Sequence, residues 1–86
     1  MKKIIEDNYK STVQRGLITP STTKTEFIDK IFEEAGEVEL SYTENKGEID
    51  WSEVADVVLV CFNFAHHYKI DIENELRKKI KKNFNR

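Results

Sequence analysis

Acidic residues in two neighbouring segments have the types and spacing that could hold a divalent cation. The first segment spans residues 33–37 with the sequence EEAGE, and the second spans residues 53–56 with the sequence EVAD. Both lie within strongly apolar patterns, where an unpaired carboxylate costs several kcal/mol or becomes neutral through a raised pKa. A cation bound between the two segments would remove that cost.

The three glutamates of the first segment take different positions on a helix. At about 100° per residue, Glu34 falls in the middle of an apolar stripe, and Glu37 lies about 60° to one side of it. Glu33 lies farther round, towards the polar face. We therefore expect Glu34 to be buried, Glu37 to lie at the edge and Glu33 to face outward. The stripe consists of Phe27, Ile31 and Val38.

The second segment repeats the anomaly on the next predicted helix. Glu53 and Asp56 are three residues apart, ahead of Val60, on a helix with almost no polar face. The short connection favours an antiparallel hairpin, in which the two acid pairs face each other. Ala35 and Gly36 are small, so we expect them to let the second helix approach closely.

The ligand chemistry favours a hard cation. A cluster of carboxylate oxygens suits Mg²⁺, with Mn²⁺ as a possible substitute. The zinc alternative lacks its ligands, because His66 and His67 are adjacent and point about 100° apart on a helix, and Cys61 stands alone. Since Mg²⁺ binds through carboxylates plus substrate phosphates, the cluster implies metal-assisted attack of water on phosphorus.

Each acid taken alone also has a purely structural explanation. Glu53 stands at the third position of its helix, where a glutamate commonly completes a capping box. Glu33, Glu37 and Glu39 could be solvated surface acids. The paired arrangement in two adjacent apolar helices favours a metal site over these explanations.

Four helices must position these residues, and the scarcity of glycine and proline argues against a β-rich fold. Thr23 and Glu26 form a capping-box pattern, and Asp50 and Asp71 are suitable N-caps. Gly16 is a plausible helix stop. The predicted helices cover residues 4–14, about 23 to 41 or 43, about 50–68, and 72 to about 83.

Length and composition predict one all-α domain, residues 1–86, with a thin core. The net charge of −2 with 35% charged residues indicates a mixed, solvated surface, and no apolar stretch reaches the roughly 18 residues of a membrane span. The single cysteine, Cys61, is expected to be reduced and buried, and no signal peptide is recognisable. We therefore expect a cytoplasmic protein that does not enter membranes.

The third predicted helix is apolar almost all round between Val54 and Ala65. Such a helix is buried on most sides. In a chain this short, a second subunit would have to supply part of that burial. We therefore expect a homodimer or a homotetramer.

Three segments together resemble the MazG-like nucleotide pyrophosphohydrolases of the all-α NTP pyrophosphatase superfamily. Residues 30–38 look like the first family motif, 53–57 like the second, and 79–86 like the Lys/Asn/Arg ending of many members. The resemblance covers roughly residues 9–86. It implies a four-helix MazG-like bundle and Mg²⁺-dependent hydrolysis of a (d)NTP to the (d)NMP and pyrophosphate, in nucleotide-pool cleansing.

The resemblance also implies roles for individual residues. Glu34, Glu37, Glu53 and Asp56 would be the metal ligands. Glu33, beside Glu34, would position or deprotonate the attacking water, and these two make the catalytic pair. Lys79, Asn83 and Arg86 would contact substrate phosphates.

The basic last helix agrees with a phosphate-bearing substrate, because Arg and Lys are the side chains that bind phosphate oxygens. Lys78 and Lys81 are explained equally well as a solvated helix face. Asn63 and His67 could line a base pocket, and Trp51 could stack on a base. So could Tyr42. A structural role is at least as common for side chains of these types.

Two further functional classes compete with the enzyme. In one, the chain is a small helical binding module whose basic last helix contacts nucleic acid or a partner protein. In the other, it is an inactive relative that serves as a regulatory subunit. The intact acid set disfavours the inactive relative, and the mixed overall charge makes nucleic-acid binding unlikely.

Overall fold

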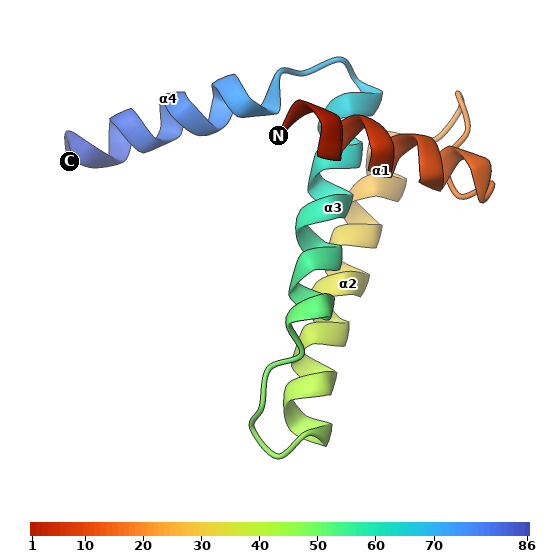
Figure 1. Cartoon of the computed structure of the whole chain (residues 1–86), viewed down its shortest axis with the longest axis vertical. Helices are drawn as coiled ribbons and strands as arrows, with labels where there is room; N and C mark the ends of the chain where they lie inside the picture. Colours follow the sequence, from red (N-terminus) through yellow and green to blue (C-terminus); the bar gives the residue numbers. More distant parts are fainter.

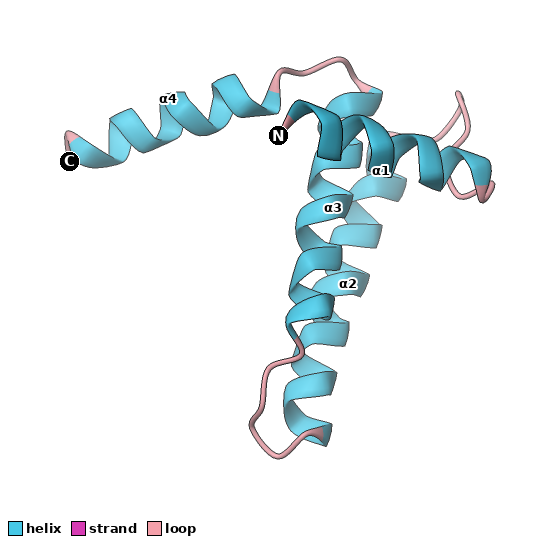
Figure 2. Cartoon of the chain, in the orientation of Figure 1, coloured by secondary structure: helices cyan, strands magenta, loops and turns pink.

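The computed structural model describes all 86 residues as four α-helices with no strand, which confirms the all-α class (Figures 1 and 2). The predicted helices are all present, with ends shifted by a turn or less. None of them is both long enough and apolar enough to cross a membrane. The helices are α1 (Lys2–Gln14), α2 (Lys24–Glu44), α3 (Trp51–His67) and α4 (Ile72–Phe84).

Local sequence signals set the helix ends. The capping box of α2 is complete, because the Glu26 amide donates to Thr23 Oγ1 at 3.2 Å and the Thr23 amide donates to Glu26 Oε2 at 3.1 Å. Asp50 caps α3 by accepting from the Ser52 amide at 3.0 Å. Gly16, just beyond α1, adopts a φ of 75°, a left-handed conformation that favours glycine at a helix stop.

The central unit is an antiparallel hairpin of α2 and α3, closed at its tip by the connection 45–50 (Figure 1). α1 crosses the other end of the hairpin, which we call the base. α4 also leaves from the base and projects away from the other helices, in contact only with α3. Tip and base therefore differ in what covers them.

The core is small and lies where α1 crosses the base of the hairpin. Phe27 of α2 stacks on Phe64 of α3 with ring centroids 5.1 Å apart. The sequence predicts that α3 is buried on most sides, but within one chain only two of its residues, Asn63 and Ala65, are buried. Cys61 is half-buried rather than buried, and this burial raises the pKa of its thiol. The buried apolar residues are Ile5, Ile18, Phe27 and Ala65.

Candidate metal centre

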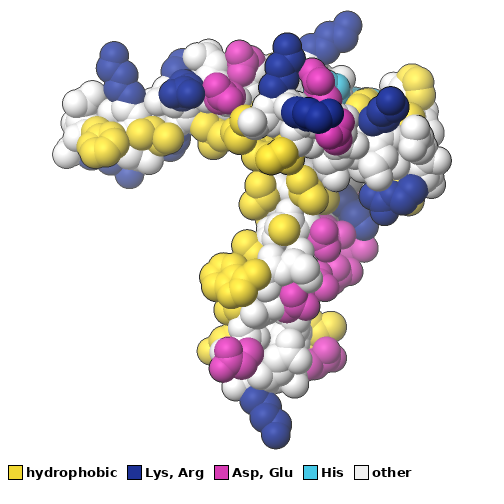
Figure 3. Space-filling view, viewed as in Figure 1, with side chains coloured by type: hydrophobic (Ala, Val, Ile, Leu, Met, Phe, Trp, Pro, Cys, Tyr) yellow, Lys and Arg dark blue, Asp and Glu magenta, His cyan; other side chains and the backbone are white.

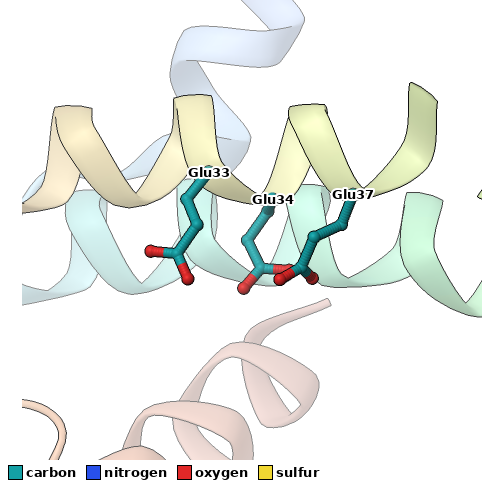
Figure 4. A group of neighbouring side chains, drawn as sticks. All are labelled: Glu33, Glu34 and Glu37. Atoms are coloured by element: carbon teal, nitrogen blue, oxygen red, sulfur yellow. The ribbon is translucent and has the colours of Figure 1, made fainter. Parts of the chain in front are cut away.

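The predicted acids gather on the face of the hairpin that lies beneath α1 (Figure 3). Glu33, Glu34 and Glu37 project from α2 in the same general direction, with the carboxylates of Glu34 and Glu37 side by side (Figure 4). Glu34 is buried, with 8% of its surface exposed, whereas Glu33 and Glu37 are exposed. The predicted burial of Glu34 and the outward position of Glu33 are confirmed.

The acids form two groups that share Glu34. Carboxylate oxygens of Glu33, Glu34 and Glu37 all lie within 4.8 Å of one another, and so do those of Glu34, Glu53 and Asp56. The hairpin therefore brings all four predicted metal ligands, together with Glu33, into one cluster. Oxygen atoms at such separations can coordinate one hard cation or two.

Glu53 supplies an acceptor that nothing in the chain satisfies. Its Oε2 atom is buried and has no hydrogen-bond partner. Asp50 caps α3 alone, without the reciprocal bond from Glu53 that a capping box requires. A buried unsatisfied acceptor costs about 1–3 kcal/mol, and more when it is charged. A capping role therefore does not explain Glu53, whereas a bound cation would satisfy it.

Mutual repulsion perturbs the cluster. The negative charge of Glu34 is the main cause that raises the pKa of Glu37 above its usual value of 4.5. Hydrogen bonding between these two carboxyl groups contributes next, followed by desolvation and by the charges of Glu53 and Glu33. The cluster therefore favours a shared proton or a cation among its oxygens.

One lysine partly neutralises the cluster from within the chain. Lys30 Nζ lies 3.2 Å from Glu34 Oε1 and 3.3 Å from Glu33 Oε1. Desolvation lowers the pKa of Lys30, but the hydrogen bonds to Glu34 and Glu33 outweigh it and raise the pKa. Because no other basic side chain forms an ion pair with the five acids, the site stays strongly negative.

The small residues of the first segment do not play the predicted role. A Cβ atom added to Gly36 would meet no atom within 4 Å, and Ala35 is exposed. The helical count explains the error, because position 36 lies about 180° from Phe27, which packs against α3. The hairpin therefore brings its acids together without any close approach at Gly36.

A cavity of about 470 Å³ adjoins the cluster between α1, α2 and α3. Asn63 is buried in its wall, where its carboxamide accepts from Asn8 Nδ2 at 2.9 Å and donates to Thr12 Oγ1 at 3.1 Å. The cavity also contains Arg15, a cation from α1 near the acids. The sequence did not reveal the α1 contribution, because the apolar pattern of that helix is weak.

The other predicted base-pocket residues lie elsewhere. His67 Nδ1 is hydrogen-bonded to the Tyr9 hydroxyl at 2.7 Å, and the His67 ring packs on Phe27 with centroids 5.1 Å apart. It lines a different cavity, at the base of the hairpin. Trp51 is 72% exposed at the start of α3, and Tyr42 is also exposed. Neither lines the cavity beside the acids.

The predicted phosphate contacts are not brought to the acids within one chain. Lys79 and Asn83 are exposed on α4, which follows the last turn of α3, and Arg86 is exposed just beyond the end of α4. Glu53 and Asp56 lie in the first turns of α3, roughly 20 Å away along its axis. α4 then projects away from the hairpin instead of returning along it (Figure 1).

No known protein family, curated protein or solved structure matches the chain. The MazG-like resemblance therefore stays a prediction that rests on the residues themselves. The geometry of the acids is independent of that resemblance.

Proposed function

We propose that the chain is an Mg²⁺-dependent nucleoside triphosphate pyrophosphohydrolase of the MazG-like type. It would hydrolyse a (d)NTP to the (d)NMP and pyrophosphate, as a homo-oligomer in the cytoplasm. The observation that carries the proposal is the buried, unpartnered Glu53 Oε2 atom within a cluster of five carboxylates. A structural acid cluster would leave that atom unsatisfied.

The donor set fits Mg²⁺ in charge and ligand type. Glu34, Glu53 and Asp56 would hold the cation from both helices of the hairpin, and Glu37 would complete the set from the exposed edge. When bound, Mg²⁺ would supply positive charge for the phosphate oxygens and so favour attack on phosphorus. Glu33, exposed beside Glu34, would position a water molecule or take its proton.

The adjoining cavity supports a nucleotide as the substrate. A triphosphate at the acids would place the nucleoside towards α1, in the cavity of about 470 Å³. Asn63, Asn8 and Arg15 supply hydrogen-bonding groups there. Because the Asn63 carboxamide is already engaged by its neighbours, it orders the wall of the cavity.

The projecting α4 favours the binding module as a second candidate. This helix carries five exposed basic residues, and Arg86 follows it. It makes no contact with α1 or α2, and only Arg77 and Lys78 form ion pairs, both within the helix, so the other cations are free to meet nucleic acid or an acidic protein. That function leaves the acids structural and gives no reason for the orphaned Glu53 oxygen. The basic residues are Arg77, Lys78, Lys79, Lys81, Lys82 and Arg86.

The proposal is tested by incubating the protein with each NTP and dNTP and Mg²⁺, and measuring the pyrophosphate released. We expect release from at least one nucleotide, loss of release after chelation, and a loss of roughly 100-fold or more in Glu37→Gln and in Asp56→Asn. The matched control is Glu39→Gln, on the same helix outside the cluster. Unchanged release in both cluster variants would contradict the metal site, and no release from any nucleotide would contradict the function.

A further inference from the structure

Asn8 of α1 lies in the wall of the cavity beside the acids, and the hydrogen bonds around it fix the orientation of its carboxamide. The side chain is half-buried, so a molecule in the cavity can contact it. A carboxamide has an oxygen that accepts and a nitrogen that donates two protons. Which of the two is left for a ligand depends on what the neighbouring groups require.

The direction of these hydrogen bonds is set first at Thr12. Its hydroxyl donates its single proton to the backbone carbonyl oxygen of Asn8 at 2.8 Å, so Thr12 Oγ1 can only accept from Asn63. Asn63 Nδ2 donates to Thr12 Oγ1 at 3.1 Å, and this places Asn63 Oδ1 towards Asn8. Asn8 must therefore present its side-chain nitrogen to Asn63.

Both protons of Asn8 Nδ2 are used within the chain. One goes to Asn63 Oδ1 at 2.9 Å, and the other goes to the backbone carbonyl oxygen of Leu59 at 3.4 Å. A reversed carboxamide would bring Asn8 Oδ1 against these two acceptors and deprive both of this donor. Asn8 Oδ1 itself has no partner in the chain and, unlike Glu53 Oε2, is not shut off from solvent. Asn8 therefore offers a ligand an acceptor and no donor.

The other polar side chains of the cavity do not take over this position. Arg15 lies seven residues beyond Asn8, about 10 Å along α1, and it is exposed. Lys30 is held by Glu34 and Glu33 at the acids. Asn63 is buried behind its bonds to Asn8 and Thr12. Asn8 Oδ1 is therefore the oriented polar atom that a ligand meets at this end of the cavity.

This end of the cavity is the one that would receive the base of a nucleotide. Asp56 belongs to the acid cluster and Asn63 contacts Asn8, and both line the cavity. They are seven residues apart on α3, which corresponds to about 10 Å along the helix axis. In a nucleotide the sugar follows the phosphates and the base lies farthest from them. With the phosphates at the acids, the base is therefore the part that reaches Asn8.

We infer that Asn8 Oδ1 selects nucleotides whose base carries an amino group, cytosine or adenine, over those with a carbonyl oxygen in its place, uracil or hypoxanthine. This inference rests on the function proposed above. An amino group donates to Oδ1, whereas a carbonyl oxygen would face it as a second acceptor and leave both unpaired. A site that is built to pair with a donor rejects the analogue that lacks it.

Two matched pairs of nucleotides test the inference on the unsubstituted chain. CTP and UTP differ in this part of the base, as do ATP and ITP, whereas the sugar and the phosphates are the same. We expect kcat/KM with Mg²⁺ to be roughly 10- to 100-fold higher for the amino member of at least one pair. Equal values within both pairs, or higher values for UTP and ITP, would overturn the inference and leave the hydrolysis itself intact.

Binding of the reaction products separates this inference from the proposed function. Calorimetric titration with CMP, UMP, AMP and IMP requires no hydrolysis, and we expect the same order of affinity within each pair. A chain that binds CMP more tightly than UMP but hydrolyses no triphosphate would support the selection by Asn8 and contradict only the function. A chain that neither binds a monophosphate nor prefers one triphosphate of a pair would overturn the inference.

The sugar hydroxyls are the other donors that a nucleotide could offer to Asn8. We expect dCTP and 3′-deoxy-CTP to keep the advantage over the corresponding uracil nucleotides. If removal of a sugar hydroxyl abolishes turnover while CTP and UTP react equally well, the acceptor binds the sugar and the inference is wrong.

Three variants assign the preference to Asn8 and to its orientation. Asn8→Ala removes the acceptor, so we expect it to abolish the preference within the pair. Asn63→Leu keeps Asn8 but removes the partner that orients it, so the preference should decrease, an effect that a merely structural role of Asn63 would not produce. Lys10→Ala, exposed on the same helix outside the cavity, is the control and should keep the preference. An undiminished preference in Asn8→Ala with its helical content retained would overturn the inference; if that variant does not fold, the matched pairs on the unsubstituted chain decide.

Discussion

The two long faces of the α2–α3 hairpin are both unfavourable in an isolated chain, but for opposite reasons. The acid face, beneath α1, holds five carboxylates with one lysine among them. The opposite face, towards α4, exposes large apolar side chains to water. The first calls for positive charge, and the second calls for apolar contact.

The two faces raise the free energy of the isolated chain in different ways. The electrostatic cost is concentrated in a few atoms, above all Glu53 Oε2, and a single ion can remove it. The hydrophobic cost is spread over many exposed apolar side chains and is proportional to the apolar area exposed, so only a partner that covers a large area removes it. One hairpin can thus combine a compact chemical site with an extended docking surface.

The largest expected effect is on the free energy of unfolding, and it distinguishes the buried core from the exposed apolar side chains. Phe27 is 4% exposed and stacks on Phe64, so Phe27→Ala should cost about 3–5 kcal/mol in the free energy of unfolding. The same substitution at Phe32, on the same helix but exposed, should leave the unfolding of dilute protein within about 0.5 kcal/mol. Urea denaturation at several protein concentrations measures both.

For Phe32→Ala we expect a second effect that Phe27→Ala lacks. It should weaken self-association, because this large apolar side chain is 73% exposed and available to a second copy of the chain. Equal losses of stability in the two variants at every concentration would show that the two apolar regions do not differ as the burial indicates.

The sequence predicted the acid face better than the apolar one, and the reason is physical. Four helices and the cluster of Glu34, Glu53 and Asp56 follow from spacing within two adjacent helices, where a short connection permits only an antiparallel hairpin. The position of α4 follows from no local rule. Its amphipathic pattern is equally compatible with folding back on its own hairpin or docking on another.

The contribution of α1 was missed for the same reason. Asn8 and Thr12 meet Asn63 across more than fifty residues of sequence, and a polar side chain on a weak helix carries no signal of such a partner. Gly36 shows the converse error. A small residue was taken as a sign of close packing, although its position on the helix faces open space.

The next prediction concerns the cation at the acid face. A ligand that binds only the folded state stabilises it by about 2.7 kcal/mol at a hundred times its dissociation constant. Mg²⁺ should therefore raise the melting temperature of the unsubstituted chain and of Glu39→Gln, but not that of Glu53→Gln. Calorimetric titration with Mg²⁺, in the absence of nucleotide, provides the corresponding affinities.

Because it needs no substrate, this measurement examines the metal site apart from hydrolysis. An unsubstituted chain whose melting temperature does not respond to Mg²⁺ or Mn²⁺ would contradict the metal site. In that case the acid face would have to be satisfied by protonation alone.

A smaller effect is expected in the pH dependence of the metal-free protein. The pKa of Glu37 is raised above 4.5 in the folded state, so the folded chain binds more protons than the unfolded chain above that pH. Stability should therefore fall as the pH rises from about 4.5 through the raised pKa. Glu37→Gln removes the group that titrates, so its stability should fall less over the same range.

Urea denaturation in the presence of a chelator, at a series of pH values, tests this prediction, with Glu39→Gln as the control. Binding of Mg²⁺ should strengthen over the same pH range, because the cation displaces the proton that the carboxylates share. A Glu37→Gln chain whose stability has the same pH dependence as the unsubstituted chain would show that the acids do not repel one another as their spacing indicates.

The smallest effect is expected at Lys30, the one basic residue that forms ion pairs with the acids of this face. Its ammonium group lies 3.2 Å from Glu34, so it must give up this contact when a metal ion takes the same carboxylate. Lys30→Met should therefore tighten Mg²⁺ binding, by roughly two- to fivefold, since a partly exposed ion pair is worth up to about 1 kcal/mol. Lys46→Met, in the exposed connection at the tip, is the control for the change in net charge. If Lys30→Met instead weakens Mg²⁺ binding, the lysine does not compete with the cation. The result would show that Lys30 orders the cluster by holding the carboxylates in the positions from which they bind Mg²⁺.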